Sequence, residues 1–526
     1  MHTEPSHLTR PASDPVLREK KPKENLKQRA YLNSVTSMLD YGTTQVVGFI
    51  VNPFLVSGVG SVLYGVWQML GQMTGYAGLA DTKAIQVLKW SIAKKRDVVS
   101  EDELRSYVTS ALLVTAFILP LILIFGVILS WYAPYITGVS QEYTDIVRLT
   151  CAILIGALII NRVFSLFESV LRGMNLGYKR MGLRAGIILF GGVLKITALM
   201  LGYGLVGLAV VQVFVALITG LSLYYIVKKN IGWFGFGKTD TSNVFRFGKL
   251  SGWYMGREFA KMLLLHSDKI ILGVIAGPVL VTTYALTKFP ALTIQGIVTN
   301  VIHGMKPGLG TILGQKEYKR VMTIRTHIMT LTWLITTALG ISVFLFNESF
   351  INLWVGGEYF AGKEVNLLIV LMAIQYIFIQ NDGGIVSLSL NIRTQVYLSY
   401  IAAVLTIVFS YFLINQFGIL GLCVSIIGGR IVLSVGLPMI VKKRLESDKL
   451  VDFQMMIRPV AVSIVLLTVS YLLADSITVH QWTYLIPGIV VSITATLFIC
   501  WFLGLNPMQR SELMNIFKNL KIFKTD

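Results

Sequence analysis

Charged side chains inside apolar stretches are the most chemically informative residues of this sequence. Within residues 249–275, a helix turning ~100° per residue places Arg257, Lys261 and Asp268 within about 40° of one another. An ionisable group at the centre of a bilayer costs about 2.5–3.5 kcal/mol on insertion scales, so such groups usually face a cavity. We interpret this face as a cavity wall. The alternative is an internal salt-bridge cluster, because Glu258 precedes Lys261 by three residues.

Two more basic residues lie deep in apolar stretches. Lys288 stands two residues before Pro290, and Arg430 lies near the middle of its stretch. Arginine suits phosphate because its planar fork donates two parallel hydrogen bonds. Together with Arg257 and Lys261, these residues outnumber the acidic groups at depth. They therefore predict a binding site for an anionic, phosphate-type group rather than for a cation.

Acidic residues at depth are candidates for binding a coupling ion. Asp40 lies about midway along residues 30–53, on the polar face of a stretch that is barely apolar enough to span a membrane. A carboxylate there is either protonated or paired with a cation, so Asp40 is a candidate for binding Na⁺ or H⁺. A structural ion pair with Lys195 or Arg162 is the alternative. The further candidates for ion coupling are Asp268 and Asp382.

A polar stripe follows one face of residues 62–80. Tyr64, Gln68, Gln72 and Tyr76 recur every four residues. These amides and phenols are able to hydrogen-bond sugar hydroxyls, which makes Tyr64, Gln68 and Gln72 candidates for sugar contact. The alternative is that they join neighbouring helices to one another.

No pattern of residues indicates catalysis. The sequence has no H-E-x-x-H, Walker A, nucleophile-elbow or paired-carboxylate motif, so we expect no enzyme activity, cofactor or metal. Cys151, Cys423 and Cys500 lie in apolar stretches and predict buried, inert thiols. His266 falls on the far side of its helix, near the outer end. It predicts an interfacial histidine without a catalytic role.

Composition shows which solvent the chain is built for. Apolar residues make up 54% of its 526 residues and charged residues 14%, whereas soluble domains carry about 25% charge. The apolar residues form blocks of roughly 20, the length that crosses ~30 Å of hydrocarbon. We therefore predict an all-α polytopic membrane protein. Its fourteen expected spans are residues 30–53, 62–80, 107–131, 146–168, 182–203, 205–228, 249–275, 280–304, 325–346, 364–388, 394–415, 419–441, 456–474 and 483–504.

The basic residues predict the orientation of these spans. Lys and Arg gather in alternate connections and in both tails, so we expect these segments and both termini to be cytoplasmic. The net charge of +19 is explained by this placement beside anionic lipid, without nucleic acid. Residues 1–29 are polar, contain several prolines and lack the apolar core of a cleavable signal, which predicts a disordered tail.

An internal repeat divides the chain. The stretch from Arg184 aligns without a gap with the stretch from Leu398, and both share G-x-x-G-L and I-V-K-K. An offset of 214 residues spans six helices, so the repeats run parallel around a central cavity. The expected segments are a tail (1–29), a six-helix lobe (30–230), a linker (231–248), a second six-helix lobe (249–443), two added helices (444–505) and a tail (506–526).

Several degenerate stretches carry a family resemblance. They include GVGSVLYGVWQML, LHSDKIILGVIAGPVLVTTYALTKFPAL, MKPGLGTILGQKEYKRVM, ESFINLWVGGEYF and GLNPMQRSELMNIFKNL. The chain resembles the oligosaccharide (O-antigen type) flippases of the multidrug/oligosaccharidyl-lipid/polysaccharide exporter superfamily. This resemblance implies translocation of undecaprenyl-pyrophosphate-linked oligosaccharide units across the bacterial inner membrane, by alternating access. It also implies partners in the same pathway, such as a polymerase and a chain-length regulator.

Three other functions share some of these features. A multidrug/cation antiporter of the same superfamily usually has twelve spans and an acidic or aromatic cavity. A lipid II flippase also has fourteen spans and a cationic cavity, but its first-helix and loop signatures are not found here. A membrane polymerase or ligase has a long outer loop, whereas the outer connections here are short.

Overall fold

The computed structural model describes residues 26–77, 84–388, 393–446 and 453–521. Throughout these ranges the regular structure is helical, without strands. The α-helices are α1 (Leu26–Ala77), α2 (Ala84–Lys95), α3 (Glu101–Thr137), α4 (Thr144–Gly173), α5 (Leu183–Met200), α6 (Gly204–Asn230), α7 (Thr241–His266), α8 (Asp268–Ala276), α9 (Pro278–Gly314), α10 (Tyr318–Trp354), α11 (Lys363–Leu388), α12 (Arg393–Arg444), α13 (Phe453–Leu473), α14 (Trp482–Ile499) and α15 (Pro507–Lys521).

The helices are compatible with the expected number of membrane crossings. Within the described ranges, ten helices are long and apolar enough to span a membrane. Two of them are much longer than a bilayer needs and break at a glycine, α1 at Gly60 and α12 at Gly418. Each of these two is long enough for a pair of crossings. With α9 and the combined α7 and α8, the arrangement accommodates fourteen crossings, and this count stays a prediction.

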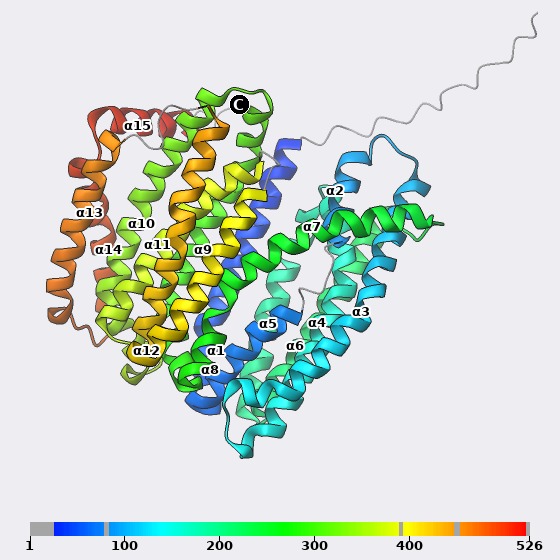
Figure 1. Cartoon of the computed structure of the whole chain (residues 1–526), viewed down its shortest axis with the longest axis horizontal. Helices are drawn as coiled ribbons and strands as arrows, with labels where there is room; N and C mark the ends of the chain where they lie inside the picture. Colours follow the sequence, from blue (N-terminus) through cyan, green and yellow to red (C-terminus); the bar gives the residue numbers. More distant parts are fainter. Residues whose placement is uncertain (1–25, 78–83, 389–392, 447–452, 522–526) are drawn as a thin grey trace, which may run out of the picture.

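One expected span is broken in two. Residues 249–275 do not form one continuous helix, because α7 ends at His266 and α8 begins at Asp268. α7 runs obliquely across the molecule (Figure 1) and packs against α2 and α3 as well as α12. The angle between Lys261 and Asp268 expected for an uninterrupted helix therefore does not apply. Asp268 is the first residue of a new helix.

The parallel repeat is visible in the backbone at two pairs of glycines. Gly204 and Gly418, which are equivalent at the offset of 214, have φ of 52° and 54°. Gly60 and Gly277 have φ/ψ of 79°/169° and 85°/165°, and each is followed by x-Val-Leu. Positive φ is a conformation that glycine adopts readily and other residues rarely do. We call α1–α6 the N lobe and α7–α12 the C lobe.

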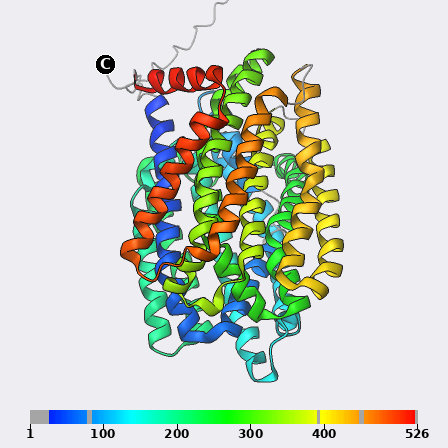
Figure 2. The same ribbon diagram turned by 90° about the vertical axis from the view of Figure 1, so that its left-hand side faces the viewer.

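The two lobes share a core at one end of the molecule and have separate cores at the other. A single cluster of buried residues joins helices of both lobes around the turns at Gly60 and Gly277. Farther away, α2, α3, α4 and α6 enclose one cluster and α9–α12 another. The beginning of α1 and helix α15 lie together at this second end (Figures 1 and 2). We call the two ends the Gly60 end and the α15 end; the basic connections predict that the α15 end is cytoplasmic.

Close backbone contacts hold the lobes together at the Gly60 end. A Cβ atom on Gly65 of α1 would lie 1.9 Å from the carbonyl oxygen of Pro278 on α9. The Thr282 hydroxyl donates a 2.6 Å hydrogen bond to the carbonyl of Ser61. The Trp354 indole of α10 donates a 2.7 Å bond to the carbonyl of Phe49. The structure is therefore closed between the lobes at the Gly60 end.

The closure predicts that two glycines of one helix differ in their tolerance of a methyl group. Gly65→Ala should push the lobes apart and cost about 1–3 kcal/mol, because the backbone of α9 has no room to yield. Gly71→Ala is the matched control, since a Cβ there meets nothing within 4 Å. Thermal unfolding of the purified variants measures the difference. Equal melting temperatures for the two variants would contradict this contact between lobes.

Candidate substrate cavity

A cavity of about 190 Å³ lies in the C lobe, on the side where α1 of the N lobe packs against it. The central cavity, as we call it, receives side chains from α1, α7, α8, α9, α11 and α12. Its ionisable and polar lining residues are Gln72, His266, Asp268, Lys269, Lys288, Gln295 and Arg430. The sequence-predicted residues Asp268, Lys288 and Arg430 are thus brought together from three different helices.

Asp268 and Lys288 form a buried ion pair in this cavity. The Lys288 ammonium lies 2.5 Å from Asp268 Oδ2, which also accepts a 2.9 Å hydrogen bond from the Tyr284 hydroxyl. The other oxygen, Oδ1, accepts the backbone N–H of Lys269 in the first turn of α8. A carboxylate is stabilised at a helix N-terminus by the exposed N–H groups and the helix dipole. The break before α8 therefore creates the position that holds Asp268.

The remaining cations of the central cavity are held by neutral oxygens. Lys269 donates a 2.7 Å hydrogen bond to the Gln68 side chain. Arg430 donates to the backbone carbonyls of Met372 and Leu264, at 3.4 and 3.3 Å. None of these partners carries a charge. Among the described lining residues, three cations thus face the single carboxylate of Asp268, which leaves the cavity basic.

A second cavity of about 280 Å³ adjoins the first at Arg430. It lies between α7, α11 and α12, and Arg430 and Leu265 line both spaces. Lys261 lines this second cavity together with Glu258 and the amides of Gln380 and Gln395. Arg430 therefore stands at the junction of two polar spaces. The side chain of the predicted site residue Arg257, on α7, lies outside the part that the structure describes.

Two of the three candidate sugar-contact residues, Gln68 and Gln72, link α1 to the C lobe in this structure. Gln68 accepts its hydrogen bond from Lys269, and Gln72 Oε1 lies 2.7 Å from His266 Nδ1. Tyr64 is buried, and its hydroxyl lies 3.4 Å from the Asn52 side chain. These contacts correspond to the alternative interpretation, in which the stripe joins helices. Of the three candidates, only Gln72 lines the central cavity as described here.

His266 lies in the central cavity, contrary to the sequence-based expectation that it faces away from the charged residues. The expectation was wrong because α7 is oblique and ends at this residue. The last turn of α7 packs between α1 and α12. Leu264 on this turn therefore lines the second cavity, whereas His266 lines the central cavity. Helical periodicity within α7 does not reveal this.

The other two candidate carboxylates lie away from the central cavity and pair with arginine, and Asp40 shares Arg180 and Arg184 with Glu168. Asp40 Oδ2 is 3.1 Å from Arg180, which lies in the connection between α4 and α5. Asp382 binds Arg325 through two parallel hydrogen bonds of 2.6 and 2.9 Å. The pairing of Asp40 differs from the expected Lys195 or Arg162. It also places Asp40 near the cytoplasmic side predicted from the sequence rather than midway through the bilayer.

Sequence reasoning missed Arg180 and Arg325 as charge partners. Both are buried, although the sequence places Arg180 in a connection and Arg325 at the start of a span. The only available signal was that a carboxylate in a low-dielectric environment needs a cation. That requirement does not identify the partner, because the pairs join residues 140 and 57 positions apart.

Comparison with known proteins identifies the family. Residues 32–304, just over half of the chain, match the family model described as "Polysaccharide biosynthesis protein". The chain belongs to this family. A Shigella flexneri protein described as "Putative O-antigen transporter" is 24% identical over 407 residues, covering 75% of this chain and 93% of that protein. The expected resemblance to O-antigen type flippases is therefore confirmed.

Two solved structures of membrane transporters have a similar fold. The structure "Lipid II flippase MurJ, inward closed conformation" has a TM-score of 0.65 at 13% identity, covering 90% of this chain and 99% of that one. An inward-facing multidrug resistance MATE transporter of the MOP superfamily has a TM-score of 0.58 at 14% identity, covering 79% and 98%. At these identities the likeness concerns the fold alone. It confirms the all-α, two-lobe architecture of this family member.

The Asp268–Lys288 pair predicts a non-additive effect on stability. Asp268→Asn leaves Lys288 without its counter-charge, and breaking a buried pair in this way costs about 3–5 kcal/mol. The double variant Asp268→Asn, Lys288→Met removes both charges and should recover most of that loss. Thermal unfolding of the two single variants and the double variant measures the coupling. Additive losses would contradict a direct interaction.

Proposed function

We propose that this chain is a flippase that moves undecaprenyl-pyrophosphate-linked oligosaccharide units from the cytoplasmic to the outer leaflet, for assembly of a cell-surface polysaccharide. The observation that carries the proposal is the basic central cavity, where Lys269, Lys288 and Arg430 face one carboxylate. A pyrophosphate carries negative charge that only fixed cations balance in a low-dielectric space. Membership of the polysaccharide biosynthesis family supports the same conclusion.

The arrangement of the lobes supports transport by alternating access. The Gly60 end is closed by a core that both lobes share, whereas at the α15 end each lobe has a core of its own. A headgroup entering from the α15 end would meet the second cavity with Lys261, and then Arg430 at the junction with the central cavity. Rocking of the lobes about this point would then expose the central cavity to the other side.

The polar surfaces of both cavities suit the sugar part of the substrate. Gln72 in the central cavity and Gln380 and Gln395 in the second provide amide donors and acceptors. The bonds that now join Gln68 and Gln72 to α7 and α8 would be released as the lobes separate at the Gly60 end. We therefore retain Tyr64, Gln68 and Gln72 as candidate sugar contacts of a different conformation.

Ion coupling forms the second part of the proposal. Moving a charged lipid against a gradient requires an energy source, and H⁺ or Na⁺ is the candidate supply. Asp40, Asp268 and Asp382 each pair with a cation in this conformation. An H⁺ or Na⁺ ion would bind such a carboxylate more tightly in a conformation in which the paired Lys or Arg has moved away. Because a ligand favours the conformation that it binds more tightly, binding of the ion would then be coupled to movement of the helices.

The fold is compatible with two other classes of substrate, which differ in how well they suit the central cavity. A cationic drug, as in the multidrug antiporter alternative, would face three cations in the central cavity. A lipid II flippase carries the same pyrophosphate headgroup, and it differs from our proposal in the sugar. The proposed setting is the bacterial inner membrane, with membrane lipid as neighbour and a polymerase and chain-length regulator as pathway partners.

Export of polysaccharide tests the headgroup site. In a strain that lacks its own flippase, the chain with Arg430→Ala or Lys261→Ala should restore at least about tenfold less surface polysaccharide than the unchanged chain, at equal protein in the membrane. Arg430→Lys should keep partial function, because the charge remains but the fork is lost. Lys238→Ala, in the exposed linker before α7, is the control. Full export by an Arg430→Ala, Lys261→Ala double variant would overturn the cationic site.

Transport by carboxamide variants tests ion coupling. In proteoliposomes with a pH or Na⁺ gradient, substitution of the coupling carboxylate by asparagine should abolish the ion dependence while substrate binding remains. Asp40→Asn is the first variant to test. Asp40 lies on α1, and α1 packs against α9 and so joins the N lobe to the C lobe. Asp268→Asn and Asp382→Asn follow, and in these two only the ion dependence is compared, because each leaves a buried cation without its counter-charge. An unchanged ion dependence in all three variants would contradict coupling through these residues.

A further inference from the structure

A large pocket lies inside the C lobe at the α15 end. Its volume is about 880 Å³, and the ends of α9, α10, α11 and α12 form its walls. We call it the α9–α12 pocket. It is within the range of known ligand pockets, about 300–1,000 Å³. Its lining residues are Gly310, Leu313, Gly314, Lys316, Tyr318, Ile385, Val386, Leu388, Thr394, Ile440, Val441, Lys443, Arg444 and Leu445.

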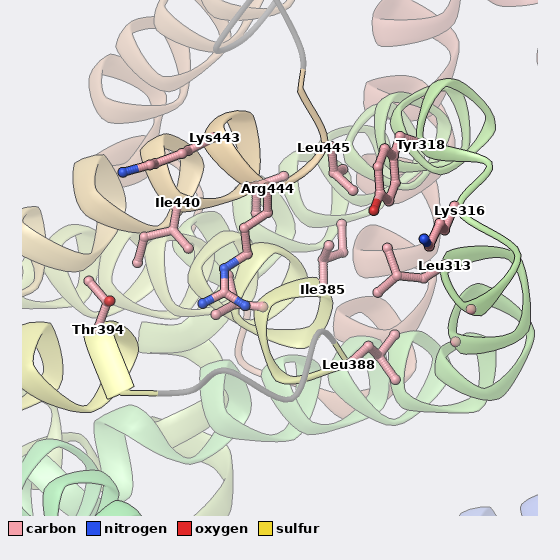
Figure 3. A pocket seen from close by; sticks show the side chains of 14 residues that line it. Leu313, Lys316, Tyr318, Ile385, Leu388, Thr394, Ile440, Lys443, Arg444 and Leu445 are labelled. Carbon is pink, nitrogen blue, oxygen red and sulfur yellow. The ribbon is translucent and has the colours of Figure 1, made fainter.

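The lining combines cations with an apolar wall. Lys316, Lys443 and Arg444 line the pocket, and no carboxylate is among its described lining residues. Figure 3 shows the Arg444 guanidinium between Thr394 and Ile385, across the space from Leu388 and Lys316, whereas Lys443 extends out of the space. Basic residues at cytoplasmic helix ends are common and usually point to water. Here they border a concavity instead.

The backbone fixes the position of Lys316 at the rim. It follows the end of α9 with a φ of 61°, which is uncommon for a residue other than glycine. Its N–H bonds the carbonyl of Leu313, and the N–H of Glu317 bonds that of Ile312, as in a helix C-terminal cap. The turn holds Lys316 on the same side as Tyr318, whose hydroxyl points into the pocket in Figure 3.

The α9–α12 pocket is separate from the proposed transport route. It shares no described lining residue with the central cavity or the second cavity. All of its walls come from one lobe, so it does not depend on how the two lobes are placed. A ligand there would occupy a site distinct from the one that holds the transported headgroup.

We propose that the α9–α12 pocket binds an anionic phospholipid of the cytoplasmic leaflet. Its phosphodiester lies against Arg444, which supplies charge-assisted hydrogen bonds, and the flexible side chain of Lys316 turns to it from the opposite side of the pocket. Its acyl chain follows the apolar wall of Leu313, Ile385 and Leu388. A free phosphate gains nothing from such a wall, whereas a phospholipid fills both the basic and the apolar parts. Basic pockets between helices on the cytoplasmic side suit anionic headgroups in the same way.

This ligand would join two parts of the C lobe that lie far apart along the chain. Lys316 lies in the connection from α9 to α10, and Arg444 lies at the end of α12. A phosphate held by both would tie these ends together in an anionic bilayer. The inference does not rest on the proposed substrate, because the same contacts would form whatever the central cavity transports.

Lipid binding to the purified full-length chain tests the proposal. Native mass spectrometry, with phosphatidylglycerol and phosphatidylcholine of the same acyl chains, measures the bound fraction of each lipid. The unchanged chain should bind phosphatidylglycerol more tightly than phosphatidylcholine. Arg444→Gln and Lys316→Gly should each weaken phosphatidylglycerol binding about tenfold, the effect of one charge-assisted contact. Lys316→Gly suits the positive φ, so folding is not the reason for the loss.

The matched control is Lys442→Ala, which removes one charge from the same turn of α12 but is not a lining residue. It should bind phosphatidylglycerol as the unchanged chain does. Equal losses in the control and the two pocket variants would overturn the proposal, since general surface charge would then explain binding. Displacement of the lipid by millimolar inorganic phosphate would also overturn it, because the site would then be one for a soluble anion.

Discussion

A buried ion pair between Asp268 and Lys288 is the interaction on which the centre of this molecule depends. Both side chains are nearly removed from solvent, where an unpaired charge costs several kcal/mol. The pair is complete only because α7 stops and α8 begins at Asp268, which offers the carboxylate a helix N-terminus. With Asp268 neutralised in this way, Lys269 and Arg430 give the central cavity its basic character.

Glycines determine how closely the two lobes approach around this pair. The equivalent turns at Gly60 and Gly277 have nearly the same backbone conformation, which indicates that the repeat includes the first hairpin of each lobe. Gly65 then lets the backbone of α9 come into contact with α1. The shared core forms at this end only. A two-lobe molecule that is closed at one end and has separate cores at the other is compatible with the alternating access that we propose.

The sequence predicted the helical architecture, the parallel repeat and the presence of cations deep in the chain, because apolar length, glycine spacing and charge are local properties. It did not predict which charges meet. Asp40 pairs with Arg180 and Asp382 with Arg325, and these contacts arise from the packing of distant segments. The break before Asp268 was missed because the apolar pattern continues across it. For the same reason His266 was placed on the wrong side of the cavity.

We propose that the central cavity selects a diphosphate anion over a cation. Equilibrium binding of the purified full-length chain to undecaprenyl pyrophosphate, undecaprenyl phosphate and a lipophilic organic cation tests it most directly. We expect the chain to bind the pyrophosphate at least about tenfold more tightly than the monophosphate. Salt should weaken the binding of the pyrophosphate, and the organic cation should leave it unchanged. Tighter binding of the organic cation, or displacement of the pyrophosphate by it, would contradict the account.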